Sequence, residues 1–388
     1  MKVISISTDR NIFKEGSSVQ LRMIEYAGLF EELHIIVFSK RSHSVGAKLQ
    51  LAPNCFAYAT NSISRWSYVL GALRIGKSIL RGGGDWVVDA QDPFECGFVA
   101  SKISNRFKIP LHIQIHTDFL SSYFASSSIL NRIRVIVARI VLPRVNGIRV
   151  VSERVRSSLT ASSLKLKAAV TVLPIFSDIS NISAMTPSFD LKQKYPQWNF
   201  ILLMVGRLSD EKNIVFALSV FKKLVVVYPK IGLVVVGDGP LKRNLMWRVW
   251  LSGLSKHVVF ENWQGDVVSY YKTANIFLQT SLYEGFGIAL LEAVAAGLPA
   301  VSSDVGIAPE LLNHKGHSFV CPVNDLDCFT KTISGLIENN QLRLFFSTQI
   351  APGAVAPFVQ EKLTYLALYK ASIEGAQQAF LGQIFPVE

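Results

Sequence analysis

The chain has 388 residues, of which 49% are hydrophobic and 18% are charged, and its formal net charge is +12. This composition excludes a disordered polar chain, and the length is sufficient for two domains of ordinary size. No uncharged apolar run reaches about 18 residues, so the sequence predicts no transmembrane helix. The opening residues, M-K-V-I-S-I-S, predict a β-strand and not a signal peptide, because no cleavage pattern follows them.

The positive charge is concentrated in the first half of the chain. Residues 1–178 contain 23 Lys and Arg against 12 Asp and Glu, whereas the remainder contains 17 against 16. We therefore expect the first half to meet an anionic partner or an anionic surface. The sequence shows no nucleic-acid-binding motif, so we expect no nucleic-acid partner.

Four cysteines are present, and none of them lies at C-x-x-C spacing. The sequence also has no His/Cys cluster with the spacing of a zinc site, so we expect reduced thiols and no metal centre. The cysteines are Cys55, Cys96, Cys321 and Cys328.

Apolar runs with strand character alternate with helical stretches along the whole chain. Continuous apolar strands separated by helices predict parallel sheets that are covered on both faces. Two such sets predict an α/β chain with two doubly wound, Rossmann-like domains facing a central cleft, with ligands beyond the carboxyl ends of the strands. The predicted strands are 3–7, 34–38, 86–89, 111–116, 147–151, 170–173, 200–205, 232–236, 258–260, 276–279, 300–302 and 318–321.

A polar, proline-containing segment at residues 177–188 marks the expected domain boundary. We therefore expect an N-terminal domain at 1–178 and a C-terminal domain at 179–354. The tail at 355–388 is rich in Ala and Leu and predicts a helix that opens at Pro357.

The segment S-L-Y-E-G-F-G-I-A-L-L-E, residues 281–292, follows the predicted strand 276–279. Its Gly-Phe-Gly turn opens an apolar helix and separates two carboxylates, Glu284 and Glu292. The free N–H groups and the dipole at the start of a helix favour an anion. With a carboxylate on each side, the pattern favours a ligand that combines phosphate and hydroxyl groups, as a nucleotide-sugar does.

A second segment, V-G-R-L-S-D-E-K-N at residues 205–213, follows the predicted strand 200–205. It places Arg207 and Lys212 at the end of that strand. Arginine grips a diphosphate through a planar fork and lysine acts as a point charge, so the pair suits a departing diphosphate. The alternative is a solvated loop in which these cations pair with Asp210 or Glu211.

Together with I-H-T-D-F at residues 115–119, these segments resemble the motifs of retaining glycosyltransferases of glycosyltransferase family 4. Glu284 and Glu292 correspond to the E-x7-E motif of that family, and the resemblance extends over residues 1–340. It implies the GT-B fold, with acceptor held by the first domain, donor held by the second, and the last helix crossing back onto the first.

The resemblance also implies a retaining, metal-independent glycosyltransferase that needs no cofactor. The donor substrate would be a UDP- or GDP-sugar. The acceptor would be a glycan or a lipid-linked molecule in the synthesis of cell-envelope polysaccharide or glycolipid. The alternatives are a nucleotide-sugar 2-epimerase of the same fold and a non-catalytic membrane- or glycan-binding module.

Individual roles follow from the same resemblance. His116, Glu284, Arg207 and Lys212 are implied to be catalytic, and Asp118 to orient His116 or to contact acceptor. From the residues alone, His116 is also explained as a satisfied strand-end residue and Gly16 as an ordinary turn. The implied donor-binding residues are Gly16, Gly206, Arg207, Lys212, Gly237, Glu284, Gly285, Phe286, Gly287, Ile288, Ala289 and Glu292.

The loop D-V-G-I-A-P-E, residues 304–310, departs from the D-V-G-G-x-x-E that the family often has. The following H-K-G-H, residues 314–317, departs from the usual D-G-x-x-G. We expect this loop to lie beside the site and to influence donor preference.

Two basic amphipathic stretches, 63–81 and 129–144, have the pattern of helices that bind anionic lipid surfaces. The alternative is that they cover the sheet with their basic residues outward. We expect a cytoplasmic protein that contacts the inner face of the plasma membrane through its basic N-terminal domain.

Overall fold

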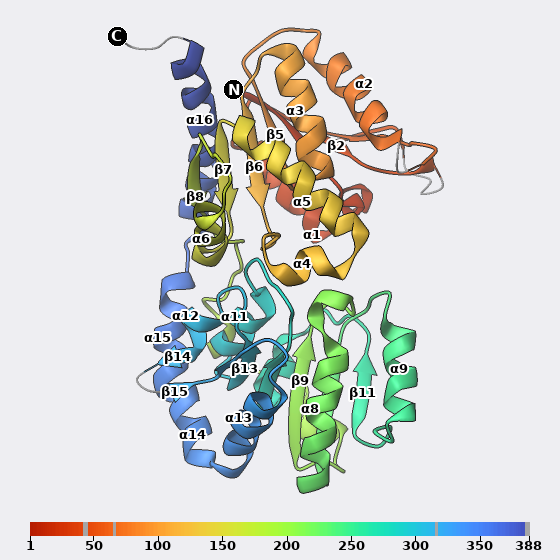
Figure 1. Cartoon of the computed structure of the whole chain (residues 1–388), viewed down its shortest axis with the longest axis vertical. Coiled ribbons are helices and arrows are strands. Elements are labelled where there is room, and N and C mark those ends of the chain that lie inside the picture. The colour runs from red at the N-terminus through yellow and green to blue at the C-terminus, as the bar shows by residue number, and fades with distance from the viewer. Residues whose placement is uncertain (42–45, 65–66, 315–316, 385–388) are drawn as a thin grey trace. The chain divides into compact units, whose positions relative to one another are not determined.

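The computed structural model describes residues 1–41, 46–64, 67–314 and 317–384. The chain divides into two compact units (Figure 1). The first comprises Met1–Pro174 together with the residues from Glu361 onward, and the second comprises Ile175–Gln360. In each unit, mainly parallel strands form a large sheet with helices packed on it, which is the predicted doubly wound α/β class.

The first unit contains an eight-stranded sheet in the order β3-β4-β2-β1-β5-β6-β7-β8. All neighbouring strands are parallel except β3 and β4. The chain reverses its direction across the sheet between β1 and β5. The strands are β1 Lys2–Ser7, β2 Glu32–Val37, β3 Lys48–Ala52, β4 Cys55–Ala59, β5 Trp86–Ala90, β6 Leu111–Ile115, β7 Gly147–Val150 and β8 Ala169–Val172.

The sequence predicted six of these strands and missed the pair β3 and β4. These two form an antiparallel hairpin at the edge of the sheet. β3 is largely exposed, and in β4 buried and half-buried residues alternate. Because one face of such a hairpin is exposed to solvent, its strands lack the continuous apolar run by which buried parallel strands are identified.

Helices α2, α3 and α5 pack side by side as one layer over this sheet (Figure 1), with α3 between the other two. Helix α2 carries residues of the predicted basic stretch 63–81, of which Arg65 and Trp66 lie outside the described residues. The helices of the first unit are η1 Arg10–Phe13, α1 Ser18–Ala27, α2 Tyr68–Leu80, α3 Glu95–Phe107, α4 Ser122–Ser127, α5 Ile129–Val141, η4 Leu142–Arg144, α6 Glu153–Ala161 and α16 Lys362–Ile384.

A buried polar network runs across the middle of the first sheet. His112 Nδ1 lies 2.8 Å from Asp89 Oδ1, and the Gln114 side-chain amide donates to Asp89 Oδ2 at 2.9 Å. Arg149 donates to Gln114 Oε1 at 2.7 Å and to the carbonyls of Leu173 and Pro174. Because these groups are almost fully buried, each depends on the others for its hydrogen bonds.

The last helix, α16, completes this network. The Arg149 guanidinium donates to the Tyr365 hydroxyl at 3.0 Å, and the Gln114 amide donates to the Tyr369 hydroxyl at 3.0 Å. The Tyr365 hydroxyl also lies 3.1 Å from that of Tyr26 in α1. The C-terminal helix is therefore an integral part of the first unit.

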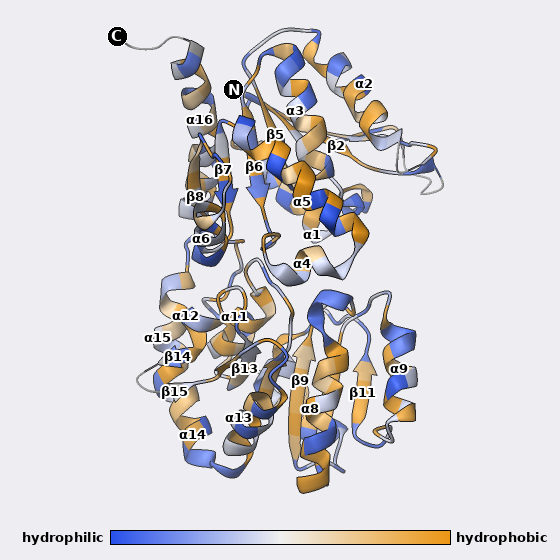
Figure 2. Cartoon of the chain, viewed as in Figure 1, coloured by the Kyte–Doolittle hydropathy of each residue, from blue (hydrophilic) through white to orange (hydrophobic). Residues whose placement is uncertain are grey.

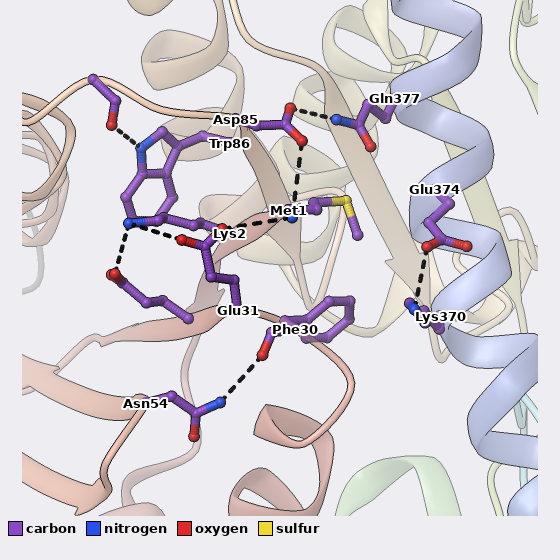
Figure 3. A network of polar contacts seen from close by, with 12 residues as sticks. Met1, Lys2, Phe30, Glu31, Asn54, Asp85, Trp86, Lys370, Glu374 and Gln377 are labelled. Atoms are coloured by element: carbon purple, nitrogen blue, oxygen red, sulfur yellow. Dashed lines mark hydrogen bonds and ion pairs between the residues drawn. The ribbon is translucent and has the colours of Figure 1, made fainter.

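Figure 3 shows a second attachment of α16, at the amino edge of β1 and β5. The Asp85 carboxylate lies 3.9 Å from the amino group of Met1 and accepts a hydrogen bond from Gln377 of α16. Lys2 pairs in the same region with Glu31. These polar contacts join α16 to segments that lie far from it in the sequence.

The second unit contains a six-stranded parallel sheet in the order β11-β10-β9-β12-β13-β16. Its direction reverses between β9 and β12, which are neighbours. The predicted apolar strands of this half are all confirmed. They are β9 Phe200–Val205, β10 Ile231–Val236, β11 Val258–Glu261, β12 Ile276–Gln279, β13 Ala300–Ser303 and β16 Val320–Cys321, and a small antiparallel pair consists of β14 Asn313–His314 and β15 His317–Ser318.

The prediction that Pro357 opens the last helix is wrong. Pro357 lies in a short 3₁₀ turn, and α16 begins at Lys362. The helices of the second unit are η5 Ile182–Ala184, α7 Leu191–Lys194, η6 Asp210–Lys212, α8 Ile214–Val227, α9 Lys242–Leu251, α10 Val268–Thr273, α11 Ile288–Ala295, α12 Ala308–Leu312, α13 Leu326–Glu338, α14 Asn340–Phe345, the π-helix η7 Phe346–Ile350, α15 Ala351–Val355 and η8 Ala356–Phe358.

The expectation of reduced thiols is wrong for one pair of cysteines. Cys321 in β16 and Cys328 in α13 form a disulfide, with their Cα atoms 5.8 Å apart. Their separation of 7 residues is enough for the chain to turn from the strand into the helix and bring the two thiols together. Cys55 and Cys96 are free and buried.

The buried network predicts a large cost for removing Arg149. In Arg149→Met, Gln114 and two carbonyl groups lose a charged donor, and we expect a loss of about 3 kcal/mol in unfolding free energy. Arg156→Met is the matched control, because Arg156 pairs with Glu153 on the surface, where a pair contributes about 0–1 kcal/mol. Urea unfolding followed by circular dichroism measures both, and equal losses would contradict the importance of the network.

Candidate functional site

The topology of the second unit singles out one place for a ligand. In a doubly wound sheet, the crevice beyond the carboxyl ends of the strands opens where the strand order reverses. Here that place lies between β9 and β12. The two segments that follow these strands are 206–213 and 280–287, which contain half of the site residues that the sequence predicted.

Hydrogen bonds join these two segments directly. The Thr280 hydroxyl donates to the carbonyls of Lys212 and Asn213, at 3.1 and 3.2 Å. The Leu282 N–H donates to the Glu211 carbonyl at 2.8 Å. The backbone around Lys212 is thereby fixed against the end of β12.

Lys212 and Glu284 form an ion pair across the two segments. Lys212 Nζ lies 2.5 Å from Glu284 Oε1, and the Ser281 hydroxyl donates to the same oxygen at 2.7 Å. The side chains are only 23% and 13% exposed. The alternative in which Lys212 pairs with a carboxylate of its own loop is therefore wrong. A charge-assisted pair shielded in this way holds both groups in fixed positions.

Two glycines allow the strand-end turns to approach each other. Gly206 and Gly237 have φ of +153° and +147°, which only glycine adopts readily. A Cβ on Gly237 would lie 1.9 Å from the Gly206 carbonyl oxygen. The exposed Arg207 follows Gly206. The hollow beside these turns has about 310 Å³ of empty space, open solvent included, and its lining includes Gly206, Arg207, Lys212, Gln279, Thr280 and Ser281.

The turn after Glu284 leads into helix α11 as predicted. Gly287 has φ of +107° and its carbonyl accepts from the N–H groups of Leu290 and Leu291. The N–H groups of Ile288 and Ala289 therefore have no acceptor inside the helix, as is usual for a first turn. Together with the positive end of the helix dipole, they suit an anion.

The loop after β13 packs against this turn. The Ile307 N–H donates to the Phe286 carbonyl at 3.0 Å. A Cβ on Gly306 would lie 2.2 Å from the Phe286 oxygen and 3.0 Å from Glu284 Cβ. The segment in which this sequence departs from the family pattern therefore touches the candidate site, as expected; residues 315 and 316 of the following segment lie outside the described residues.

Glu292 lies one and a half turns further along α11 and is half-buried. The Tyr271 hydroxyl donates to one of its carboxylate oxygens at 3.1 Å and the Ser177 hydroxyl to the other at 3.4 Å. Burial raises the pKa of Glu292 above its usual value, against the effect of these two hydrogen bonds. Glu292 is therefore held by two hydrogen bonds and does not lie on a fully exposed face of the helix.

The remaining predicted residues belong to the first unit. Gly16, with φ of +68°, lies in the turn before α1, and its N–H donates to Gln20 Oε1 at 3.0 Å. His116 follows β6 at the carboxyl edge of the first sheet and is half-buried. Desolvation, with a smaller contribution from the positive charge of Arg149, lowers the pKa of His116 to about 3.

Two polar atoms at this edge have no hydrogen-bond partner within the described ranges of the chain. They are His116 Nε2 and Asp118 Oδ1. Burial raises the pKa of Asp118, whereas the charge of Arg154 and a hydrogen bond from Ser158 oppose that shift. Buried polar atoms without partners are uncommon, and they suit contact with a polar ligand.

Sequence reasoning did not identify Ser177, Tyr271, Thr280 or Ser281. Thr280 and Ser281 directly follow a predicted strand, and polar residues at that position of a doubly wound sheet indicate a ligand site. Tyr271 and Ser177 come from distant segments, and nothing in their local pattern connects them with Glu292. Across the residues that the structure describes, no group of three or more His, Cys, Asp or Glu could hold a metal ion.

Gly306→Ala is predicted to disturb the site through the Phe286 carbonyl. A methyl group at residue 306 would overlap that oxygen, so we expect a loss of about 2 kcal/mol or more in unfolding free energy. Gly253→Ala is the control, since Gly253 also has a left-handed φ, +75°, but nothing lies within 4 Å of its Cβ position. Thermal unfolding measures the loss in unfolding free energy of both variants, and an equal loss in the two would exclude the clash at residue 306.

The low pKa of His116 predicts a dependence of stability on pH. In the unfolded chain His116 has a pKa of about 6.5, so below that pH the unfolded chain binds a proton that the folded chain does not bind. The contribution of His116 to the free energy of unfolding is therefore complete above pH 6.5 and is lost progressively toward pH 3. In His116→Gln, the fall in stability between pH 6.5 and 4 should be shallower than in the wild type. NMR titration of His116 provides the direct check, and protonation near pH 6.5 would contradict it.

Comparison with known proteins connects this geometry to a family. Residues 189–350 match the family model "Glycosyl transferases group 1". The chain is 27% identical over 181 residues to UDP-Gal:alpha-D-GlcNAc-diphosphoundecaprenol alpha-1,3-galactosyltransferase of Escherichia coli, covering 45% of this chain and 47% of that protein. It is 27% identical over 227 residues to alpha-monoglucosyldiacylglycerol synthase of Streptococcus pneumoniae, covering 56% and 51%. The matches thus span about half of the length of these relatives.

The fold itself matches over nearly the whole chain. The structure of sucrose-phosphate synthase from Thermosynechococcus elongatus superposes with a TM-score of 0.77 at 17% identity, covering 96% of this chain and 99% of that one. At such identity the likeness concerns the fold alone. Residues 189–350 are therefore similar to the glycosyl transferases group 1, and the two doubly wound units of the chain have the GT-B fold.

Proposed function

We propose that this protein is a retaining glycosyltransferase of family 4 that transfers a sugar from a UDP- or GDP-sugar to a glycan or lipid-linked acceptor. The observation that carries the proposal is the Lys212–Glu284 pair between two glycine turns at the β9/β12 edge. The family match covers this part of the chain. The two relatives are named for transfer to a diphosphoundecaprenol and for synthesis of a glucosyldiacylglycerol, so we place the reaction in cell-envelope polysaccharide or glycolipid synthesis.

In this proposal, the donor binds to the second unit. Arg207 and Lys212 hold the diphosphate, and the first turn of α11 supplies N–H groups to it. Glu284 accepts hydrogen bonds from the transferred sugar and Glu292 from the ribose hydroxyls. Two cations and a helix N-terminus can balance the charge of the leaving diphosphate, so the proposed reaction is metal-independent and uses no cofactor.

Donor binding changes the partner of Lys212. In the structure described here its ammonium group pairs with Glu284. A diphosphate beside Arg207 offers a stronger anionic partner, so Lys212 would turn toward phosphate and leave the Glu284 carboxylate to the sugar. The pair therefore keeps each group in place until the substrate provides separate partners for both.

The proposed displacement takes place on one face of the sugar. The acceptor hydroxyl oxygen forms a bond to the anomeric carbon on the side from which the diphosphate departs. The bond between the anomeric carbon and the phosphate oxygen breaks, and that oxygen receives the acceptor proton. The products are the glycoside, with the anomeric configuration retained, and a nucleoside diphosphate.

The first unit would supply His116, Gly16 and the acceptor-binding residues. A neutral imidazole at pH 7 can accept or donate one hydrogen bond without placing a second positive charge near the sugar. Nε2 of His116 and Oδ1 of Asp118 are polar atoms that a sugar or an acceptor hydroxyl could satisfy. Asp118 is proposed to contact acceptor or to orient His116.

A lipid acceptor requires the protein to reach a membrane surface, and α5 provides a suitable one. On this helix an apolar stripe lies opposite the side that packs against α3, and Figure 2 shows apolar and polar residues alternating along it. Arg132 and Arg139 flank the stripe and are exposed. The exposed fractions are 76% for Ile129, 49% for Ile133, 57% for Ile136 and 51% for Ile140.

Such a helix lies in a lipid interface with its apolar face inserted and its arginines near anionic headgroups. None of the helices described in the structure is long and apolar enough to cross a membrane. We therefore propose peripheral binding at the cytoplasmic face of the plasma membrane.

Transfer assays on Glu284→Gln and Lys212→Met test the donor site. Both variants should lose about 100-fold in kcat/KM, and Lys212→Met should also bind nucleoside diphosphate more weakly. The matched controls are Asp327→Asn and Lys223→Met, each of which removes one charge of an exposed ion pair in the same unit. Sugar transfer to lipid acceptors, with product anomers assigned by NMR, is the measurement.

Three outcomes would contradict the proposal. Full activity in both site variants would exclude the assigned roles. An epimerised donor without need for acceptor would identify a 2-epimerase, and lipid binding without any donor turnover would identify a non-catalytic module.

Replacing the α5 stripe should reduce membrane binding without affecting the fold. In Ile136→Ser/Ile140→Ser, we expect the affinity for phosphatidylglycerol vesicles, measured by flotation, to fall at least about 100-fold, because each lost side chain removes about 1.5–3 kcal/mol of apolar burial. Val226→Ser/Val227→Ser on α8 of the second unit is the control for exposed apolar residues. Unchanged flotation in the α5 variant would assign membrane contact to another surface.

A further inference from the structure

A basic groove lies between α2 and α3, apart from the residues discussed so far. Four cations line it, Arg74 and Lys77 from α2 and Lys102 and Arg106 from α3, and all four are exposed. The apolar lining consists of Leu73, Ile103 and Phe107, and Asn105 adds an amide. The groove encloses about 1210 Å³ of empty space, open solvent included, which is ample for a phosphate group and what is attached to it.

No carboxylate lines this groove, and in the described ranges none of its four cations forms an ion pair. Lys102 has an aromatic neighbour instead, since its Nζ lies 5.3 Å from the centre of the Phe98 ring. By contrast, Arg134 on α5 of the same layer pairs with Glu95. The groove therefore concentrates positive charge that the protein leaves unbalanced.

Helix dipoles explain part of this pattern. Lys77 and Arg106 lie in the last turns of their helices, where positive charge is favourable, whereas Arg74 and Lys102 lie near the middle. The dipole of each helix acts on that helix alone. It therefore does not explain why cations of two helices line the same groove. Like charges gathered in one hollow repel each other, and a bound anion relieves that repulsion.

The groove lies at the edge of the first sheet opposite to the predicted substrate-binding edge. Helices α2 and α3 end shortly before β5 and β6 begin, so the groove lies toward the amino ends of these strands. His116 follows the carboxyl end of β6. A ligand in the groove would therefore not be a reacting substrate.

We propose that the groove between α2 and α3 is a binding site for a phosphate group, distinct from the donor site. Arg74 and Arg106 would hold the phosphate oxygens through planar forks, with Lys77 and Lys102 as point charges. The apolar lining would contact the organic part of a phosphate ester. The phosphate belongs either to the headgroup of an anionic lipid or to a soluble phosphate ester, and this inference does not depend on the proposed glycosyl transfer.

Binding of two probes to the full chain, in the presence of saturating UDP so that the donor site is occupied, tests this proposal. The probes are glycerol 3-phosphate, measured by calorimetry, and vesicles of phosphatidylcholine with or without phosphatidylglycerol, measured by flotation. The groove variant is Lys102→Ala/Arg106→Ala. The control is Lys165→Ala/Lys167→Ala, which removes the same charge from exposed positions of the same unit.

We expect the groove variant to lose at least about tenfold in affinity for one probe, with the control close to wild type. Loss with glycerol 3-phosphate identifies a soluble phosphate ester, and loss with phosphatidylglycerol vesicles alone identifies a lipid headgroup. A charge-retaining variant, Lys102→Arg/Arg106→Lys, should recover most of the binding. Equal effects of the groove and control variants, or no effect with either probe, would overturn the proposal.

Discussion

The ion pair between Lys212 and Glu284 connects the two halves of the second sheet at the point where its strand order reverses. Each residue follows a different strand, so the pair exists only because β9 and β12 are neighbours. The hydrogen bonds from Thr280 fix the same two segments to each other. Since the pair is mostly shielded from solvent, its two charged groups keep fixed positions beside the glycine turns. The proposed chemistry depends on these positions, because the diphosphate must contact the cation while the sugar contacts the carboxylate.

Around this pair, glycines let backbone segments of the second unit approach each other more closely than a side chain would allow. Gly206 and Gly237 bring two strand-end turns into contact, and Gly306 brings the loop after β13 against the Phe286 carbonyl. A change in that loop therefore acts on the Glu284 turn through backbone atoms. Residues 304–310, where the sequence departs from the pattern of the family it resembles, are therefore in contact with the Glu284 turn.

The sequence predicted the parts of the fold that are buried on both sides. The central strands of both sheets are continuous apolar runs, and their ends carry the glycine and polar residues that indicated a site. The hairpin at 48–59 was missed because it lies at an edge, and the disulfide because its cysteines meet through a strand-to-helix turn. The partners of Glu292 were missed for a similar reason, since Tyr271 and Ser177 approach it only in the folded chain.

Thermal unfolding of the purified protein with UDP-, GDP- and ADP-sugars, each with magnesium or with EDTA, tests the donor site most directly. A ligand that binds only the folded chain stabilises it, by about 2.7 kcal/mol at about 100 times its Kd. We predict a rise in Tm with a UDP- or a GDP-sugar that EDTA does not abolish and that Lys212→Met reduces. No rise with any nucleotide-sugar, or an equal rise in Lys212→Met, would contradict a donor site at the β9/β12 edge.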